Sequence, residues 1–258
     1  MLLLKDKIVM VTGAGQGIGR GVAEAVAEAG GTVVATDLNL EAATATAAAV
    51  TAAGGQASGV GLDVTDEEAF RSVTAGVVDG LGRLDGMVNN AGVLAMGPAF
   101  NDPLDEWRRQ MEVNVLGVAT GCKAAAQQMK AQGGGSIVNV ASNAGKVGYP
   151  NMAAYNASKA AVINLTRSLA AEWAEHQINV NAVCPGGVAT PMLSDVADWV
   201  GERIDRDPEE LLATMVPTQL GRHIQPIEVG RVVVFLLSDQ ATIIRGQAIN
   251  VDGGDTPY

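Results

Sequence analysis

Short apolar runs alternate with longer amphipathic stretches along the whole chain of 258 residues. The apolar runs predict buried strands at 8–12, 32–37, 57–62, 84–89, 135–141, 178–184 and 247–251. Helical periodicity predicts helices at 22–29, 40–53, 66–80, 105–131, 152–175 and 226–237. This alternation indicates an α/β fold with a doubly wound parallel sheet of about seven strands. We expect one domain over residues 1–258, because no linker or fixed-period repeat interrupts the pattern.

The first predicted strand runs directly into a glycine-rich turn with the spacing T-G-x-x-x-G-x-G over residues 12–19. Glycines let the backbone approach a diphosphate closely, and a helix N-terminus offers unpaired N–H groups. Strand, turn and helix in this order therefore predict a dinucleotide site. The residues that we expect there are Gly13, Gln16, Gly17, Ile18 and Gly19. A tight turn without a ligand is the alternative.

The second predicted strand ends in Asp37. A carboxylate at this place would accept hydrogen bonds from the adenosine ribose and repel a 2′-phosphate. Gln16 and Leu38 are both neutral, whereas a site for the phosphate would need a nearby cation. We therefore predict NAD(H) rather than NADP(H) as the cofactor, and an ordinary solvated aspartate is the alternative.

Tyr155 and Lys159 stand four residues apart in the predicted helix 152–175, so they project from the same face. An ammonium beside a phenol favours the phenolate, and we expect Lys159 to lower the pKa of Tyr155. Ser142 follows the preceding strand and is placed to hold a substrate oxygen. Such a trio can exchange a proton near neutral pH. Taken alone, this Tyr–Lys spacing would indicate only the rim of a buried helix face.

The composition restricts the partners of this chain. A formal net charge of −11 argues against binding to nucleic acid or to an anionic membrane. The two histidines and two cysteines lack metal-ligand spacing, so we expect no metal site and two reduced thiols, Cys122 and Cys184. No apolar run reaches transmembrane length, and Lys5 closes the short leucine run near the N-terminus. We expect a cytoplasmic protein.

In order and spacing, the motifs resemble the short-chain dehydrogenase/reductase family over essentially the whole chain. The resemblance is carried by the glycine turn, Asp63, Asn89-Asn90-Ala91-Gly92, Asn114, Ser142, Tyr155, Lys159, Pro185-Gly186 and Thr190. It implies a Rossmann-type fold and a catalytic tetrad of Asn114, Ser142, Tyr155 and Lys159. In that tetrad Tyr155 would be the general acid and base, and Lys159 would also reach the nicotinamide ribose.

The resemblance also implies roles for other residues. Asn114 would interrupt the helix 105–131 locally and hold a water that links Lys159 to bulk solvent. Without the family, an asparagine on a long helix would be expected to face solvent. Asn89 would connect neighbouring strands. The remaining cofactor contacts would come from Asp63, Val64, Asn90, Ala91, Gly92, Pro185, Gly186, Val188 and Thr190.

A segment at about 190–222, after the sixth predicted strand, combines mixed charge with helical patches and predicts a lid. Its length resembles relatives that oxidise polyols, acetoin-type diols and other small secondary alcohols. We therefore expect a polyol, diol or hydroxy-ketone as the substrate. The expected substrate contacts are Ala144, Tyr149, Asn151, Met192 and Trp199. A 3-oxoacyl thioester reductase and an NAD(H)-binding regulator without turnover are the alternatives.

The predicted helices 105–131 and 152–175 carry apolar or small residues on more than one face. A helix that is apolar on several sides must bury its second face as well, and a symmetric partner is a common solution. The resemblance implies that these helices pair between subunits, and we expect a homotetramer.

Overall fold

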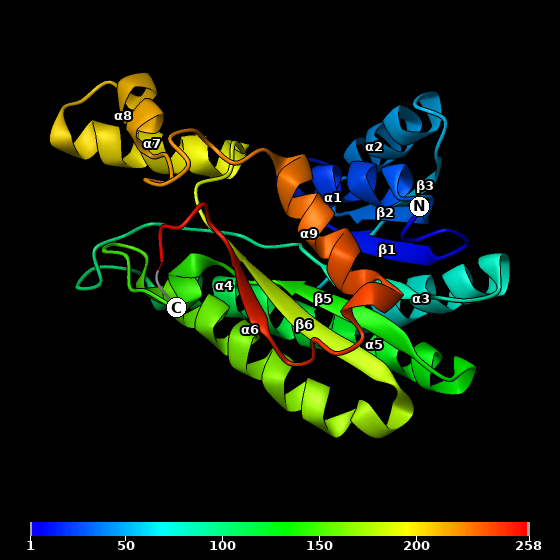
Figure 1. Ribbon diagram of the computed structural model, residues 1–258. Coiled ribbons are helices and arrows are strands. Elements are labelled where there is room, and N and C mark those ends of the chain that lie inside the picture. The colour runs from blue at the N-terminus through cyan, green and yellow to red at the C-terminus, as the bar shows by residue number, and fades with distance from the viewer. Residues whose placement is uncertain (1, 257–258) are drawn as a thin grey trace.

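The computed structural model describes residues 2–256 and shows in them a parallel sheet of seven strands (Figure 1). The strand order is β3-β2-β1-β4-β5-β6-β7, and all neighbouring strands are parallel. The strands are β1 (Ile8–Thr12), β2 (Thr32–Asp37), β3 (Gln56–Gly61), β4 (Gly86–Asn89), β5 (Gly135–Val140), β6 (Ile178–Pro185) and β7 (Ala248–Val251). The predicted doubly wound, Rossmann-type class is confirmed.

Helices cover both faces of this sheet. They are α1 (Gly17–Glu28), α2 (Leu40–Ala52), α3 (Glu67–Leu81), α4 (Leu104–Met111), α5 (Gly117–Gln132), α6 (Ala153–Glu172), α7 (Pro191–Ile204), α8 (Pro208–Thr214) and α9 (Pro226–Leu237). Figure 1 shows α1 and α9 on one side of the sheet, and α5 and α6 on the other. Alternate residues of β1 supply the two cores: Val9 and Val11 pack on the α1–α9 side, and Met10 packs on the opposite side.

Polar caps set where α2 and α3 begin. The Asn39 side chain accepts hydrogen bonds at 3.0 and 3.2 Å from backbone N–H groups in the first turn of α2. Asp66 does the same for α3, at 3.0 and 2.9 Å. Because caps of this type satisfy N–H groups that lack intrahelical partners, both helices begin within a residue of the predicted position.

The helix predicted at 105–131 is divided in the structure. A π-helical turn, η1 (Glu112–Leu116), separates α4 from α5. The local interruption implied by the family resemblance is therefore confirmed. Asn114 lies in this turn and is fully buried, so the alternative that it faces solvent is wrong. π-helical turns of this kind often occur at functional sites.

Several other boundaries differ from the prediction; α1, for example, begins at Gly17 rather than at residue 22. β4 begins at Gly86 rather than at residue 84, because the Asp85 carboxylate accepts a hydrogen bond from the Ile8 N–H at 2.9 Å. The side chain thus takes the Ile8 N–H, whereas the Asp85 backbone still donates to the Ile8 carbonyl and accepts from Ser136 N–H. The helix predicted to end at residue 175 ends as α6 at Glu172, and a short 3-10 turn follows.

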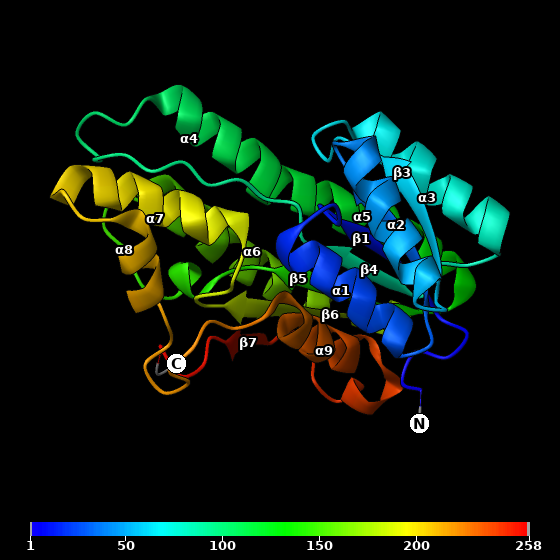
Figure 2. The ribbon, with the colours of Figure 1, turned by 90° about the horizontal axis from the view of Figure 1, so that it is seen from above.

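The order of the strands reverses between β1 and β4, and open α/β sheets bind ligands at such a point. Helices α7 and α8 lie beyond this end of the sheet, as the two views show (Figures 1 and 2). The segment predicted as a lid thus forms two helices beside the expected ligand position. Within residues 2–256, none of the helices combines the length and apolar character needed to cross a bilayer.

Candidate active site

A cavity of about 770 Å³ opens at the carboxyl ends of the strands, and its volume is within the usual range for ligand sites. We call one part the glycine end; it is lined by Gly13, Gln16, Gly17, Ile18, Asp37, Leu38, Asp63 and Val64. We call the other part the apolar end; it is lined by Leu94, Met152, Met192, Leu193, Val196, Met215 and Val216. Ser142, Tyr155 and Lys159 line the same cavity.

The backbone geometry of the β1–α1 turn requires glycine at two positions. Gly13 has a φ of 61°, and a Cβ atom there would lie 2.8 Å from the Ala91 Cα atom. A Cβ atom on Gly19 would lie 2.1 Å from the Gly13 carbonyl oxygen. Gly19 does not line the cavity; instead it lets α1 pack against the turn. The turn therefore keeps its backbone exposed to the cavity at Gly13 and Gly17.

Asn90 fixes this turn from the neighbouring strand. Its side-chain amide donates to the carbonyl oxygens of Thr12 at 2.9 Å and Gly13 at 3.0 Å. Its backbone N–H donates to the Thr12 hydroxyl at 3.0 Å. Asn90, Ala91 and Gly92 all line the cavity, as predicted from the sequence. The asparagine thus stabilises the glycine turn in addition to facing the ligand space.

The Asp37 carboxylate lies at the end of β2 and is held by two backbone donors. It accepts hydrogen bonds from Gly15 N–H at 2.9 Å and from Asn39 N–H at 3.0 Å. Asp63 accepts from the N–H and hydroxyl of Thr65, at 2.9 and 2.7 Å. Both carboxylates line the cavity, and the residues described at the glycine end include no cationic side chain.

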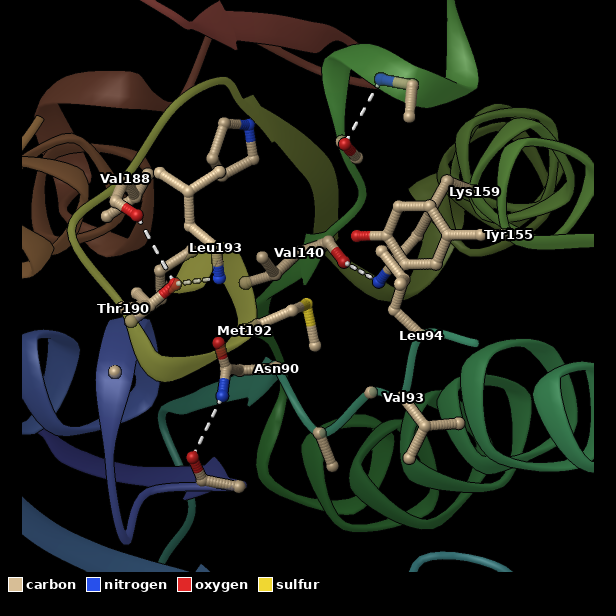
Figure 3. A pocket seen from close by; sticks show the side chains of 18 of the residues that line it. Asn90, Val93, Leu94, Val140, Tyr155, Lys159, Val188, Thr190, Met192 and Leu193 are labelled. Atoms are coloured by element: carbon tan, nitrogen blue, oxygen red, sulfur yellow. Dashed lines mark hydrogen bonds between the residues drawn. The ribbon is translucent and has the colours of Figure 1, made fainter. Parts of the chain in front are cut away.

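The side chains of Tyr155 and Lys159 lie next to each other in the site (Figure 3), and Ser142 lines the same cavity. Ser142 follows β5, whereas Tyr155 and Lys159 lie on the same face of α6. All three are buried. The Lys159 ammonium donates to the Val140 carbonyl oxygen at 3.0 Å and lies 5.6 Å from the centre of the Tyr155 ring. The trio predicted from sequence spacing therefore forms one cluster.

Burial controls the pKa values of this pair. Removal from water raises the pKa of Tyr155 to about 12, and a hydrogen bond with Ser142 opposes only part of that rise. Burial also lowers the pKa of Lys159 to about 8, because it disfavours the charged form. The net shift of the Tyr155 pKa in the protein chain is therefore upward, and the expected lowering by Lys159 stays a prediction.

The Asn114 side chain connects η1 to the segment after β4 and to α6. Its side-chain oxygen accepts from Val93 N–H at 2.8 Å, and its amide donates to the Val93 carbonyl at 2.9 Å. The same amide donates to the Ser158 hydroxyl at 3.0 Å. Ser158 directly precedes Lys159, so Asn114 ties the segment after β4 to the catalytic face of α6. It does not itself line the cavity.

The two cysteines are buried and free, as predicted. Cys122 belongs to a polar network in which Asn89 donates to Asn139 at 2.8 Å and to the thiol at 3.3 Å. Asn89 thus connects β4 with β5, in agreement with the prediction. Burial raises the pKa of Cys122 to about 12 and that of Cys184 to about 11, so both thiols stay protonated at neutral pH.

The remaining predicted cofactor positions also reach the cavity. Val64, Pro185, Gly186, Val188 and Thr190 line its wall. Thr190 additionally caps α7: its hydroxyl accepts a hydrogen bond from Leu193 N–H at 3.4 Å, and Pro191 occupies the first helical position. Its predicted contact with a carboxamide stays a prediction.

The predicted substrate contacts divide into two groups. Ala144, Tyr149 and Met192 line the cavity. Asn151 does not; it is an exposed turn residue with a φ of 60°, and its carbonyl accepts from Gly97 N–H at 2.9 Å. Trp199 does not line the cavity either, because its ring lies 3.5 Å below the guanidinium of Arg203 on α7. The polar and aromatic character of these two residues was a misleading signal.

Sequence reasoning missed several residues that line the cavity. They are Val93, Leu94, Val113, Val140, Met152, Gly187, Val196, Val216 and Asp255. Val93 directly follows the Asn-Ala-Gly motif, and Asp255 follows the carboxyl end of β7. Their position after a strand was therefore the available signal, since parallel strands deliver the following residues to the same edge.

The comparisons with known proteins agree with this architecture. A family model described as enoyl-(acyl carrier protein) reductase matches residues 13–256. The cyclopentanol dehydrogenase of Comamonas sp. is 39% identical over 253 residues, which cover 98% of each chain. The cis-4-hydroxycyclohexanecarboxylate dehydrogenase of Sinomonas cyclohexanicum is 39% identical over 253 residues and 97% of each chain.

Solved structures show the same relationship. A putative NAD(P)-dependent gluconate 5-dehydrogenase from Beutenbergia cavernae, solved with NADP bound at low occupancy, is 36% identical. Its TM-score is 0.88, and the match covers 98% of both chains. The chain therefore belongs to the short-chain dehydrogenase/reductase family.

Proposed function

We propose that this protein is an NAD-dependent oxidoreductase that interconverts a small secondary alcohol and its ketone. The observation that carries the proposal is the placement of Ser142, Tyr155 and Lys159 in one cavity with the glycine turn. A dinucleotide and an alcohol can therefore meet at the buried phenol. The oxidoreductase class agrees with the family and with the alcohol dehydrogenases among its relatives.

The glycine end fits a nicotinamide dinucleotide. A Cβ atom at Gly13 or Gly19 would collide with neighbouring backbone, so only glycine permits this close turn. Gln16 and Gly17 bring the N-terminus of α1 to the cavity. When bound, the nicotinamide would supply or accept the hydride. Asp37 favours NAD over NADP, because a 2′-phosphate would meet a carboxylate already fixed by two N–H donors.

Tyr155 exchanges the proton in this proposal. Its phenol donates to the carbonyl oxygen in ketone reduction, and its oxygen receives the hydroxyl proton in alcohol oxidation. The raised pKa keeps the phenol protonated at neutral pH, which suits the reductive direction. For oxidation, the positive charge of Lys159 stabilises the phenolate, and a pKa of about 8 leaves that charge in place at pH 7. Ser142 donates to the reacting oxygen as negative charge develops on it.

Asn114 acts as a positioning residue in this scheme. Its bonds to Val93 and Ser158 fix the segment after β4 against the turn of α6 that carries Lys159. The water link to bulk solvent that the family resemblance implies stays a prediction. We also propose a single cytoplasmic domain that assembles as a homotetramer, and the small, exposed residues of α6 support the assembly.

The test is a spectrophotometric assay of NADH and NADPH formation with a panel of secondary alcohols, combined with a binding measurement for both dinucleotides. NADH formation with a secondary alcohol is the expected result. Binding of NADH without turnover of any alcohol or ketone would indicate a regulator instead. Turnover of a 3-oxoacyl thioester, but of no simple ketone, would indicate a thioester reductase.

A further inference from the structure

The apolar end offers almost no hydrogen-bond partners to a substrate. Its seven side chains are aliphatic or thioether groups and come from four separate segments of the chain. A hydroxyl group placed among such side chains loses its hydrogen bonds to water without replacement, which is unfavourable. A polyol would bury several hydroxyls in this way, whereas a compact hydrocarbon ring or chain would bury none. The lining therefore disfavours the polyols expected from the sequence.

The polar side chains near the apolar end are already engaged. Asn143 donates its amide to the Tyr149 hydroxyl at 3.0 Å. The Ser142 hydroxyl accepts from Ala144 N–H at 3.1 Å and also bonds to Tyr155. Of these groups, Ser142 and Tyr155 form the bonded pair that would hold the one oxygen that reacts. This arrangement suits a substrate with a single hydroxyl or carbonyl group.

Asp255 adds a negative charge to the same region. It lines the cavity, and one of its carboxylate oxygens accepts from Thr218 N–H at 3.0 Å. It lies close enough to Tyr149 to contribute, after burial, to the raised pKa of that phenol, and Asp252 acts in the same direction. Among the described lining residues, Lys159 is the one cation, and its ammonium is bound to the Val140 carbonyl. Lys146 does not line the cavity and donates to the Ala248 carbonyl at 2.8 Å.

We propose that the apolar end selects compact, uncharged secondary alcohols and ketones, and that Asp255 is a specificity-determining residue that excludes substrates with a carboxylate. This inference rests on the proposed alcohol dehydrogenase function and names its substrate class. An anionic substrate would bring a like charge towards Asp255, while the one cation among the described lining residues, Lys159, is already bound to the Val140 carbonyl. Like-charge contacts are a common means of rejecting a wrong ligand. The names of its relatives include a neutral ring alcohol and a ring alcohol that carries a carboxylate, so the relationship alone does not indicate the charge of the substrate.

The experiment compares ring alcohols that differ in charge. We would measure kcat/KM for cyclohexanol and for 4-hydroxycyclohexanecarboxylate, and for 2-butanol against threitol. Cyclohexanol and 2-butanol should each exceed their polar counterparts by at least ~10-fold, a difference that one like-charge contact or one buried unpaired hydroxyl can produce. A native enzyme that prefers the carboxylate or the polyol would overturn the proposal.

Asp255→Asn tests the effect of the carboxylate charge while keeping the shape of the side chain. An asparagine oxygen can still accept from Thr218 N–H, so the local fold should persist. The variant should raise the ratio of kcat/KM for the carboxylate over cyclohexanol by roughly 3- to 10-fold, because one like charge is removed. Asp195→Asn is the matched control: Asp195 is exposed on α7 and does not line the cavity. An unchanged ratio in Asp255→Asn, with an unchanged melting temperature, would exclude Asp255 as the determinant.

A binding measurement separates this inference from the proposed function. Titration of cyclohexanone and of 4-oxocyclohexanecarboxylate into the NADH complex reports charge selection without any turnover. Selective binding of the neutral ketone with no reaction would refute the proposed function and leave the inference intact. Equal binding of both ketones would refute the inference, whatever the turnover.

Discussion

The two ends of the cavity are built from different parts of the chain. At the glycine end the walls combine glycine backbone with polar and aliphatic side chains, supplied by the β1–α1 turn and by the segments at the ends of β2 and β3. At the apolar end the walls are side chains from α7, from the loop before α6, and from the segments after β4 and α8.

This difference explains what each end reveals about function. A Cβ atom on Gly13 or Gly19 would collide with backbone, so the glycine end permits few sequences and carries a recognisable motif. Leu94, Met152 and Val196 need only be apolar and of suitable size, so many sequences build the same wall. The spacing of the glycine motif therefore indicates the cofactor class, whereas the substrate class depends on the shape and charge of the folded cavity.

Tyr155→Phe separates the two ends most sharply. The change removes one hydroxyl from the buried cluster and leaves the glycine end unaltered. Turnover should fall by ~10²–10⁴-fold, the usual loss when a general acid or base is removed. The affinity for NADH, measured by fluorescence titration, should stay within a factor of about three, since a change of that size is below one hydrogen bond.

Tyr149→Phe is the matched control, because it removes a phenolic hydroxyl from the same cavity but not from the catalytic cluster. Its turnover should fall far less than that of Tyr155→Phe. If the two variants lost similar activity, the phenol of Tyr155 would not be the proton donor.

Asp37→Ser alters the glycine end alone. Removing the carboxylate removes the like-charge contact with a 2′-phosphate, so the preference for NAD+ over NADP+ should fall by ~10- to 100-fold. The ratio of kcat/KM between two alcohols should not change. Asp79→Asn, an exposed position near the C-terminal end of α3, is the control. A native enzyme that uses NADP+ as efficiently as NAD+ would contradict the role of Asp37.

The sequence predicted the glycine end in more detail than the apolar end. Gln16, Gly17 and Asp37 line the cavity as expected, because a strand, a glycine turn and a strand-terminal acid have fixed places in this fold. The helix interruption at Asn114 followed from the family resemblance, whereas periodicity alone predicted one continuous helix. Local pattern cannot show a side-chain contact such as that between Asn114 and Ser158, which lie 44 residues apart.

At the apolar end, residue type was a poor guide. Trp199 looked like a substrate contact but stacks with Arg203, and Asp255, which sequence reasoning did not single out, lines the cavity. The raised pKa of Tyr155 was missed for a related reason. Spacing shows that Lys159 is near the phenol, but the extent of burial, which dominates the pKa, depends on elements far away in the sequence.

The pH dependence of the unfolding free energy, compared between the native protein and Lys159→Met, tests the burial of Lys159. Burial lowers the pKa of Lys159 from 10.5 to about 8, so between these pH values the unfolded chain binds a proton that the folded protein does not. The cost of burying Lys159 is therefore full below pH 8 and disappears as the pH rises to 10.5. From pH 8 to pH 10 the native protein should gain about 2 kcal/mol of unfolding free energy relative to Lys159→Met.

Urea unfolding at several pH values measures this difference. Lys123→Met is the control, because it removes an exposed lysine of the same length from α5. The opposite slope, with the native protein losing stability relative to Lys159→Met as the pH rises, would show that the ammonium is stabilised rather than disfavoured at its buried position.

Leu116→Glu tests whether assembly supports the catalytic helix from outside, and we expect the smallest effect on turnover here. Leu116 is 52% exposed in η1, which packs against α6, and the outer residues of α6 include exposed Ala157 and Ala160. An apolar, exposed surface across two adjacent elements suits a symmetric partner, and a glutamate at its centre would place a charge in that contact. Light scattering at micromolar concentration should show a tetramer for the native protein and smaller species for the variant. Turnover should fall severalfold, because Tyr155 and Lys159 lie on the opposite face of the helix that loses its support.

Ile243→Glu is the control, because Ile243 is 93% exposed beyond α9, and it should leave both assembly and turnover unchanged. A native monomer with full activity would show that α6 needs no partner to hold the catalytic pair in place.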